Sequence, residues 1–351
     1  MNSFGNKMRC TVFGASHEEY IGLTVSGFPA GVTPDHDLIS RRLAQRRALL
    51  DITSKRREGD EYRFLSGIFN GRTTGAPLTF LVKNADVRSA DYEKYRGLAR
   101  PSHADYTQHV RFQGFEDYRG GGIASGRVTV AYIILGALAE TVLREKGVFA
   151  ASRMKSVLDV EDGAEPSRED LERLREEGFP VLTPEIREKM LGLIEEARNK
   201  GDSLGGVAET WILGLPAGLG SPLFGSVEGY LSQLIFGIPG AKGIEFGSGF
   251  GIASLRGSQA NDGMFYEAGE VRHLSNHSGG INGGITNGNA VCFRVAYRPT
   301  PTIALPQPTI DFLNKENKLV EFSGRHDAIF AIKALHVQTA LANFAALDLM
   351  L

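Results

Sequence analysis

Cysteine is scarce in this chain, which has only Cys10 and Cys292 among its 351 residues. The two lie far apart in sequence, which argues against a disulfide framework and is typical of a reducing compartment. No stretch approaches eighteen uninterrupted apolar residues, and the first residues contain no apolar segment of signal-peptide length. We therefore expect a cytoplasmic protein that does not associate with a membrane.

Net charge is also small, because 39 Lys and Arg stand against 41 Asp and Glu, a formal charge of −2. This balance excludes the positive field over the whole chain that a general nucleic-acid coat needs. The densest basic stretch, residues 41–57, contains Arg41, Arg42, Arg46 and Arg47. These charges fit the face of a helix opposite its apolar residues and lack interleaved aromatics, so we expect no nucleic-acid partner.

Metal-ligand spacing is missing as well. The eight histidines include no HExxH pattern, and the two cysteines form no CxxC. We therefore expect no metal site.

Glycine, in contrast, is abundant: the chain has 43, with no Gly-X-Y period. Helical and strand periodicities alternate without a regular βαβ rhythm, which favours an α+β fold. At roughly 150 residues per domain the length allows two domains or one large one. The patterns predict strands at 9–14, 23–26, 77–83, 208–215 and 289–297, helices at 35–50, 129–146, 227–236 and 328–351, and two helices beginning at Ser167 and Thr183.

Five segments combine glycine with polar or titratable residues beyond what packing requires. They are GASHE (14–18), RPSHADYT (100–107), DYRGGGIASGRVT (117–129), SNHSGGINGGITNG (275–288) and GRHDA (324–328). Taken singly, each could be a flexible loop. The glycine triplet 120–122 precedes the helix predicted near Thr129, an arrangement that can bind an anion through bare N–H groups. Its spacing fits neither a dinucleotide fingerprint nor a P-loop, which favours a phosphomonoester ligand.

Arginines and histidines within these segments support an anionic ligand. Arg100, Arg119, Arg127 and Arg325 lie in the glycine-rich or histidine-bearing loops and can hold phosphate or carboxylate groups. His17 and His103 also lie in loops, where general acids and bases are usually presented. His36, His109 and His336 are instead expected on surfaces or helix faces.

Together the five segments resemble the chorismate synthase family, whose corresponding blocks read GESHG, RPGHADYT, DYRGGGRSSARET, SNHxGGIxGGISxG and GRHDP. They occur here in the same order, and the resemblance spans residues 9–345. It implies a single domain over residues 1–351 with a charged peripheral insert at about 160–201. It further implies a β-α-β sandwich subunit of a homotetramer.

The resemblance also implies an activity, the anti-1,4-elimination of phosphate from 5-enolpyruvylshikimate 3-phosphate with reduced FMN as cofactor. His17 and His103 match two general acids, the first directed at the leaving phosphate and the second at the flavin. Asp327 matches a carboxylate that assists proton removal at the flavin N5. Whether the protein reduces its own flavin with NADPH is left open by the sequence.

Binding residues follow from the same motifs. The positions that match anion-binding residues are Arg46, Arg100, Arg127 and Arg325. The positions that match FMN-binding residues are Ile123, Ala124, Ser125, Pro239, Gly240, Gly283, Arg298, Pro299, Thr300, Pro301, Thr302 and Arg325.

Some positions depart from the family pattern. Glu18 replaces a glycine beside His17, and we expect its carboxylate to shift the protonation of that histidine and to repel an anionic phosphate. Ile123 replaces the usual arginine. An alternative hypothesis is therefore a divergent paralogue that keeps an FMN or phosphometabolite pocket but has lost or altered the elimination.

Overall fold

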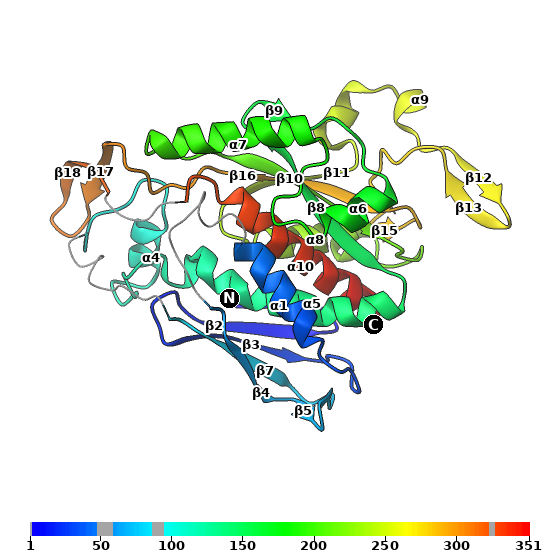
Figure 1. Ribbon diagram of the computed structural model, residues 1–351, viewed down its shortest axis with the longest axis horizontal. Helices are drawn as coiled ribbons and strands as arrows, with labels where there is room; N and C mark the ends of the chain where they lie inside the picture. The colour runs from blue at the N-terminus through cyan, green and yellow to red at the C-terminus, as the bar shows by residue number, and fades with distance from the viewer. Residues whose placement is uncertain (1, 48–58, 86–94, 323–326) are drawn as a thin grey trace.

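Two five-stranded antiparallel sheets enclose a layer of helices in the computed structural model, which describes residues 2–47, 59–85, 95–322 and 327–351 (Figure 1). The first sheet has the order β1-β2-β3-β7-β4, with β1 Ser3–Phe4, β2 Arg9–Gly14, β3 Tyr20–Ser26, β7 Leu78–Lys83 and β4 Tyr62–Ser66. The second has the order β11-β16-β10-β8-β9, with β11 Ala241–Phe246, β16 Val291–Tyr297, β10 Gly206–Leu213, β8 Phe149–Val157 and β9 Val160–Glu161.

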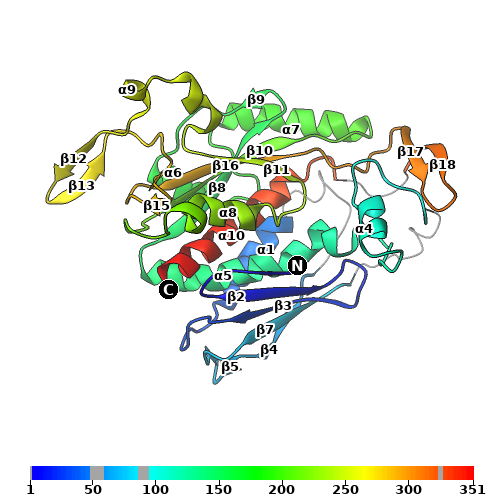
Figure 2. The same ribbon diagram turned by 180° about the vertical axis from the view of Figure 1, so that it is seen from behind.

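The middle layer consists of α1 His36–Arg47, α5 Val130–Glu145 and α10 Ala331–Met350, and both views show it between the sheets (Figures 1 and 2). Residues 126–145 are long and apolar enough to cross a membrane, but 83% of their most apolar window is buried inside the protein. A helix that is apolar nearly all round is a core element when neighbours cover it on most sides. The expected β-α-β sandwich of the α+β class is thus confirmed.

Smaller elements surround this sandwich. The helices among them are α4 Asp105–Arg111, α6 Arg168–Leu174, α7 Pro184–Asn199, α8 Val227–Ile235 and α9 Gly257–Ala260. The 3-10 turns are η1 Gly122–Ala124, η2 Gly126–Thr129, η3 Leu223–Gly225 and η4 Gly249–Ser254. The hairpins are β5 Ile68–Phe69 with β6 Arg72–Thr73, β12 Met264–Glu267 with β13 Glu270–His273, β14 Ile281–Asn282 with β15 Ile285–Thr286, and β17 Gln307–Asp311 with β18 Glu316–Val320. The charged insert at 160–201 forms β9, α6 and α7. Figure 1 shows α7 along the outside of the second sheet.

Most predicted elements are found within a few residues of their expected ends. The Ser167 hydroxyl caps α6 in a capping box with Asp170, and α7 begins with proline after Thr183. The predicted helix 35–50 is observed as α1, and its last three residues lie outside the described ranges. Strand β8 was missed because both its faces are covered, so it lacks the alternation of a half-exposed strand.

One expectation about α1 is wrong. Arg42 and Arg46 do not lie on an exposed basic face, because both are buried and are 8% and 9% exposed. Arg42 donates to both carboxylate oxygens of Glu140 on α5, at 3.0 and 2.8 Å. Two of the four arginines of α1 are thus used inside the protein, which argues against RNA binding by that face.

Candidate active site

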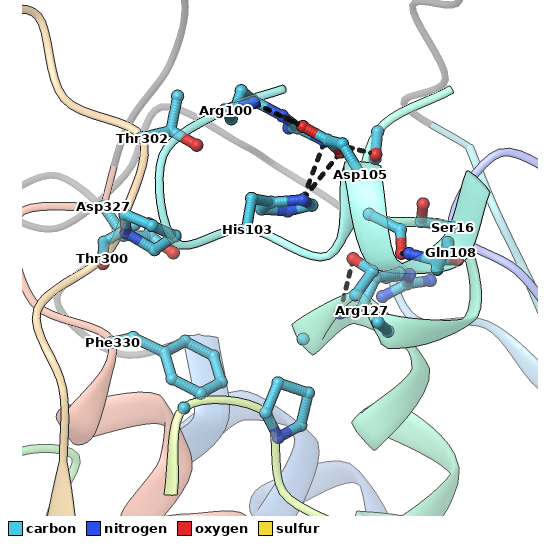
Figure 3. Close-up of a pocket in the computed structure, with 18 of the residues that line it drawn as sticks. Ser16, Arg100, His103, Asp105, Gln108, Arg127, Thr300, Thr302, Asp327 and Phe330 are labelled. Carbon is cyan, nitrogen blue, oxygen red and sulfur yellow. Dashed lines mark hydrogen bonds and ion pairs between the residues drawn. The ribbon is translucent and has the colours of Figure 1, made fainter. Parts of the chain in front are cut away.

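A cavity of about 340 Å³ lies where α5 and α10 begin, and Figure 3 shows some of the residues that line it. Such a volume is within the usual range of small-molecule sites. Segments distant in sequence line it, namely the loop after β2, the end of α1, the residues around α4, the glycine triplet with η2, and residues 239–240, 298–302 and 327–333. The sandwich therefore brings four of the five sequence segments to one place.

His17 lies in the loop after β2 and is 6% exposed. Its Nδ1 is 3.0 Å from the hydroxyl of Ser16, whose backbone N–H donates to Gly122 O at 3.2 Å. Gly120 packs against the ring: a Cβ there would be 2.3 Å from Cε1 of His17, and its φ of +62° favours glycine. One use of the glycine triplet is therefore to leave room for the imidazole.

His103 belongs to a tight cluster with Arg100 and Asp105 (Figure 3). Its Nδ1 is 2.8 Å from Asp105 Oδ1, and Arg100 holds the same carboxylate through Nε at 2.8 Å and Nη2 at 2.6 Å. Burial lowers the pKa of His103, and Asp105 opposes that shift. Burial alone would raise the pKa of Asp105, but its bonds to Arg100 and His103 bring that pKa well below its usual value, so the carboxylate stays ionised.

Arg127 is buried beside the cavity and is held by three groups. Its Nε donates to Asn84 Oδ1 at 2.9 Å, its Nη2 to Lys83 O at 3.1 Å, and its Nη1 to the Asp60 carboxylate. Asp60 is itself buried, adopts a φ of +52°, and lies 3.6 Å from Arg47 Nε. Sequence reasoning missed Asp60, because no motif contains it and its role is shown only by arginine partners that are distant along the chain and close in space.

Arg46 and Arg47 are the last two residues of α1, and both line the cavity. Arg46 is buried and donates through Nη2 to Gly126 O at 2.9 Å. Cations in the last turn of a helix are favoured by the partial negative charge of its terminus. Their guanidinium groups add positive charge to the wall below the glycine triplet.

The opposite wall consists of Pro239, Gly240 and residues 298–302, with the Phe330 ring beside them. Arg298 N–H donates to Gly240 O at 3.0 Å, and its guanidinium bonds to the carbonyl of Ser102. Thr300 accepts a bond at its carbonyl from Ser203 at 2.7 Å, yet its own buried Oγ1 has no hydrogen-bond partner within the four described ranges. A buried hydroxyl of this kind in a cavity wall points to a ligand group.

Asp327 lies just before α10 and lines the cavity (Figure 3). Lys333, in the first turn of α10, is 2.8 Å from Asp327 Oδ1. Nothing in the sequence reasoning singled out Lys333. Asp327 precedes α10 and lies six residues before Lys333, which is not the spacing of neighbours on a helix face, so no local pattern signalled this contact.

Two expected site residues do not line the cavity. Ile123 is 39% exposed on η1 and does not line the cavity. Gly283 lies in the β14–β15 turn with a φ of +61°, also away from the lining, so a turn requirement accounts for this glycine. Arg325 lies outside the described residues. Glu18 is exposed and does not line the cavity, and its expected effect on the protonation of His17 stays a prediction.

The lining is rich in cations. It contains Arg46, Arg47, Arg96, Arg100, Arg127, Arg298 and Lys333 against Asp60, Asp105, Glu116, Asp117 and Asp327. The long helices α5 and α10 both begin at the cavity, and their N-termini favour negative charge. Among the described residues no group of three His, Cys, Asp or Glu side chains could hold a metal. The fold and site define an enzyme that acts on a small, multiply anionic substrate, with two histidines in the cavity wall.

Comparisons with known proteins agree with this class. The chorismate synthase family model matches residues 8–351. The chorismate synthase of Aeropyrum pernix is 42% identical over 100% of this chain and 93% of its own length, and that of Thermococcus kodakarensis is 39% identical over 99% and 97%. A crystal structure of a chorismate synthase matches 99% of this chain and 92% of its own with a TM-score of 0.78 at 26% identity.

This chain belongs to the chorismate synthase family. Its activity is that of a phosphate-eliminating lyase, which converts 5-enolpyruvylshikimate 3-phosphate to chorismate in the biosynthesis of aromatic amino acids. The family uses reduced FMN. The resemblance stated from the five segments is thus confirmed over the whole chain.

Proposed function

We propose that the elimination takes place in this cavity, with His17, His103 and Asp327 as the proton-transferring residues. The observation that carries the proposal is that these three side chains, from distant parts of the chain, line one cavity whose other charged residues are mostly basic. His17 protonates the leaving phosphate, His103 faces the cofactor, and Asp327 assists removal of the proton. Glu18 is exposed and does not line the cavity, which favours this activity over the divergent paralogue.

Substrate binding follows from charge. The substrate carries a phosphate and two carboxylates, and Arg46, Arg100 and Arg127 with Arg325 bind these anions in the proposal. Guanidinium groups suit planar, bidentate recognition of such groups. Asp60 and Asp105 hold the guanidinium groups of Arg127 and Arg100 in fixed orientations, which reduces the cost of ordering them when substrate binds.

The residues present fit FMN. The unpartnered Thr300 Oγ1 offers a polar contact, while Gly240, with a φ of +85°, and the Phe330 ring leave an apolar, open wall for a flat ring system. Ala124, Ser125, Pro239, Gly240 and residues 298–302 would hold it. Reduced FMN, when bound, supplies electron density transiently and recovers it as the hydrogen is lost.

The protein residues then move protons at defined atoms. The Ser16 hydroxyl binds Nδ1 of His17 at 3.0 Å, so His17 exchanges its proton with the leaving phosphate through Nε2. Lys333 holds the Asp327 carboxylate at 2.8 Å and thereby orients it at the cavity wall. Positive charge from the arginines stabilises the phosphate as its negative charge grows.

We also propose that the chain assembles as a homotetramer in the cytoplasm. An arm formed by η4, α9, β12 and β13 projects from the sandwich in both views (Figures 1 and 2). It exposes large apolar side chains, with Phe250 at 86%, Tyr266 at 79% and Leu274 at 76%. Exposed apolar side chains gathered on one segment are typical of a protein interface.

The decisive experiment is phosphate release under strictly anaerobic conditions with reduced FMN and excess 5-enolpyruvylshikimate 3-phosphate. We expect many turnovers with the flavin still reduced at the end. Stoichiometric oxidation of the flavin, or activity without flavin, would overturn the proposed chemistry. FMN binding with no phosphate release would instead support the divergent paralogue. Oxidised FMN with NADPH, tested in the same assay, shows whether the chain reduces its own flavin.

A further inference from the structure

The contacts around His103 determine which of its ring nitrogens carries the proton. Two groups lie within hydrogen-bond distance of Nδ1: Asp105 Oδ1 at 2.8 Å and Arg100 Nη2 at 3.1 Å. An arginine nitrogen only donates, whereas a carboxylate only accepts. Nδ1 must therefore either accept from Arg100 or donate to Asp105.

The number of hydrogens on Arg100 Nη2 decides between these two alternatives. Arg100 Nη2 carries two hydrogens, and it lies 2.6 Å from both Asp105 Oδ1 and Gly120 O. These two short bonds use both hydrogens, so the longer contact with His103 has none left. Nδ1 of His103 is consequently the protonated nitrogen and donates to Asp105.

We propose that Asp105 is a positioning residue, which holds His103 in the Nδ1–H form and leaves Nε2 as the atom that exchanges a proton within the cavity. The inference rests on the role proposed above for His103. Arg100 fixes the carboxylate from two sides, because its backbone N–H also donates to Asp105 Oδ2 at 2.9 Å. The carboxylate can therefore neither rotate away nor reorient when the ring takes up a proton.

Three charged groups act on His103. Burial lowers its pKa, the hydrogen bond and negative charge of Asp105 raise it, and the positive charges of Arg100 and Arg298 lower it. The Asp327–Lys333 pair also lines the cavity. Since Asp105 is the group that raises the pKa, removal of its charge lowers the pKa further and reduces the protonated fraction of His103 at neutral pH.

Asp105→Asn tests this, with magic-angle-spinning NMR of sedimented, histidine-labelled protein free of ligand as the first readout. The His103 signals are assigned by their loss in His103→Gln. We expect the Nδ1–H form in the unsubstituted protein. In Asp105→Asn the asparagine N–H can donate to the ring, so we expect the Nε2–H form.

Anaerobic kinetics give the second readout. We expect kcat of Asp105→Asn to fall by about 10²-fold, the scale for a misdirected general acid, with little change in KM. The fall of activity at high pH should also shift to lower pH. Asp105→Glu, which keeps the charge, should retain the Nδ1–H form and recover part of kcat. Glu172→Gln removes one charge from the exposed ion pair with Arg168 and should change none of these readouts.

The outcomes separate the two proposals. An Nδ1–H form that persists in Asp105→Asn, or an unchanged pH profile, overturns the positioning role of Asp105. Near-full activity of His103→Ala overturns the proposed role of His103 without affecting the tautomer result. If Asp105→Asn failed to fold, loss of the Nδ1–H form in folded Asp105→Glu would overturn the inference, and its retention would support it.

Discussion

A single hydrogen atom in place of a side chain at Gly120 determines where the His17 ring can lie. The backbone of Gly120 packs on one side of the imidazole, and its carbonyl accepts from Arg100 at 2.6 Å. The other two glycines of the triplet also bind through their carbonyls, Gly121 to Gln108 and Gly122 to Ser16. The triplet thus joins the walls that carry His17 and His103.

Gly120→Ala should reduce kcat by about 10²-fold, because the new Cβ would overlap His17 and a displacement of about 1 Å can cost this much. The positive φ adds roughly 1–2 kcal/mol of strain. Anaerobic phosphate release and urea unfolding measure the two effects. Gly163→Ala is the matched control, since a Cβ there meets nothing within 4 Å. Equal activity of both variants would contradict the account.

His17→Ala should lower kcat by roughly 10²–10⁴-fold, the scale for removal of a general acid, while the fold is kept because His17 lies in a loop. Anaerobic phosphate release with reduced FMN is the measurement. His36→Ala, at an exposed position at the start of α1, should leave kcat unchanged. A fully active His17→Ala would show that another group protonates the phosphate.

Among the elements, α1 is joined to α5 by polar contacts within the core. Glu140 of α5 receives bonds from Arg42 at 2.8 Å, Arg144 at 2.7 Å and Arg175. Burial would raise the pKa of Glu140, but these arginines lower it below its usual value, so the carboxylate is charged when the protein is folded. Positioning of Arg46 and Arg47 at the cavity depends on this anchoring of α1.

Glu140→Gln should destabilise the protein by about 3–5 kcal/mol, because three arginines lose their common buried carboxylate. Urea denaturation at neutral pH measures the change. Since the folded-state pKa of Glu140 is depressed, the lost stability is present above about pH 4.5 in the unsubstituted protein and disappears as the pH falls below that. The difference between the two proteins should therefore shrink in acid, and a constant difference would refute the assignment.

His336 on α10 gives the stability of the protein a second dependence on pH. Its Nε2 lies 2.9 Å from Gly178 O, and burial, with the charges of Arg42 and Arg46, lowers its pKa to about 4. The unfolded chain therefore binds a proton that the folded one rejects, and stability should fall as the pH drops from about 6.5 to 4. His336→Gln can keep the donor without titrating, so its free energy of unfolding should vary less over this range. Parallel pH curves would rule the effect out.

At the scale of the whole molecule, the projecting arm leaves apolar surface that the sandwich does not cover. The arm is remote from the helix layer in both views (Figures 1 and 2). Its exposed side chains include Met264 at 70% and Tyr266 at 79%. Burial of such side chains between copies of the chain would supply association energy.

Sedimentation velocity should therefore give a mass about four times that of the 38.1 kDa chain. Tyr266→Ser combined with Leu274→Ser should shift the distribution to smaller species without lowering the melting temperature of the monomer fold, because exposed substitutions change stability little. Glu172→Gln on α6 serves as the control. A monomeric unsubstituted protein would contradict the tetramer, and an unaffected double variant would place the interface elsewhere.

Sequence reasoning recovered the helices and strands whose patterns are local. Periodicity located α5 and α10, and capping residues located the starts of α6 and α7. It missed β8, whose Arg153 is fully buried and pairs with Glu209 on the neighbouring strand. A covered strand with an internal ion pair has no local signature, because the compensating charge lies on another element.

The sequence alone determined the family, the sandwich class and the residue types of the site, because ordered motifs such as RPSHADYT and GRHDA keep their chemistry within a few neighbouring positions. Only the tertiary structure decided that Asp60 holds Arg127 and that Glu18, Gly283 and Ile123 do not line the cavity. The physical reason is the distance along the chain over which each effect acts. Backbone propensity and motif chemistry act between sequence neighbours, whereas burial, ion pairing and protonation depend on groups that folding brings together from distant parts of the chain.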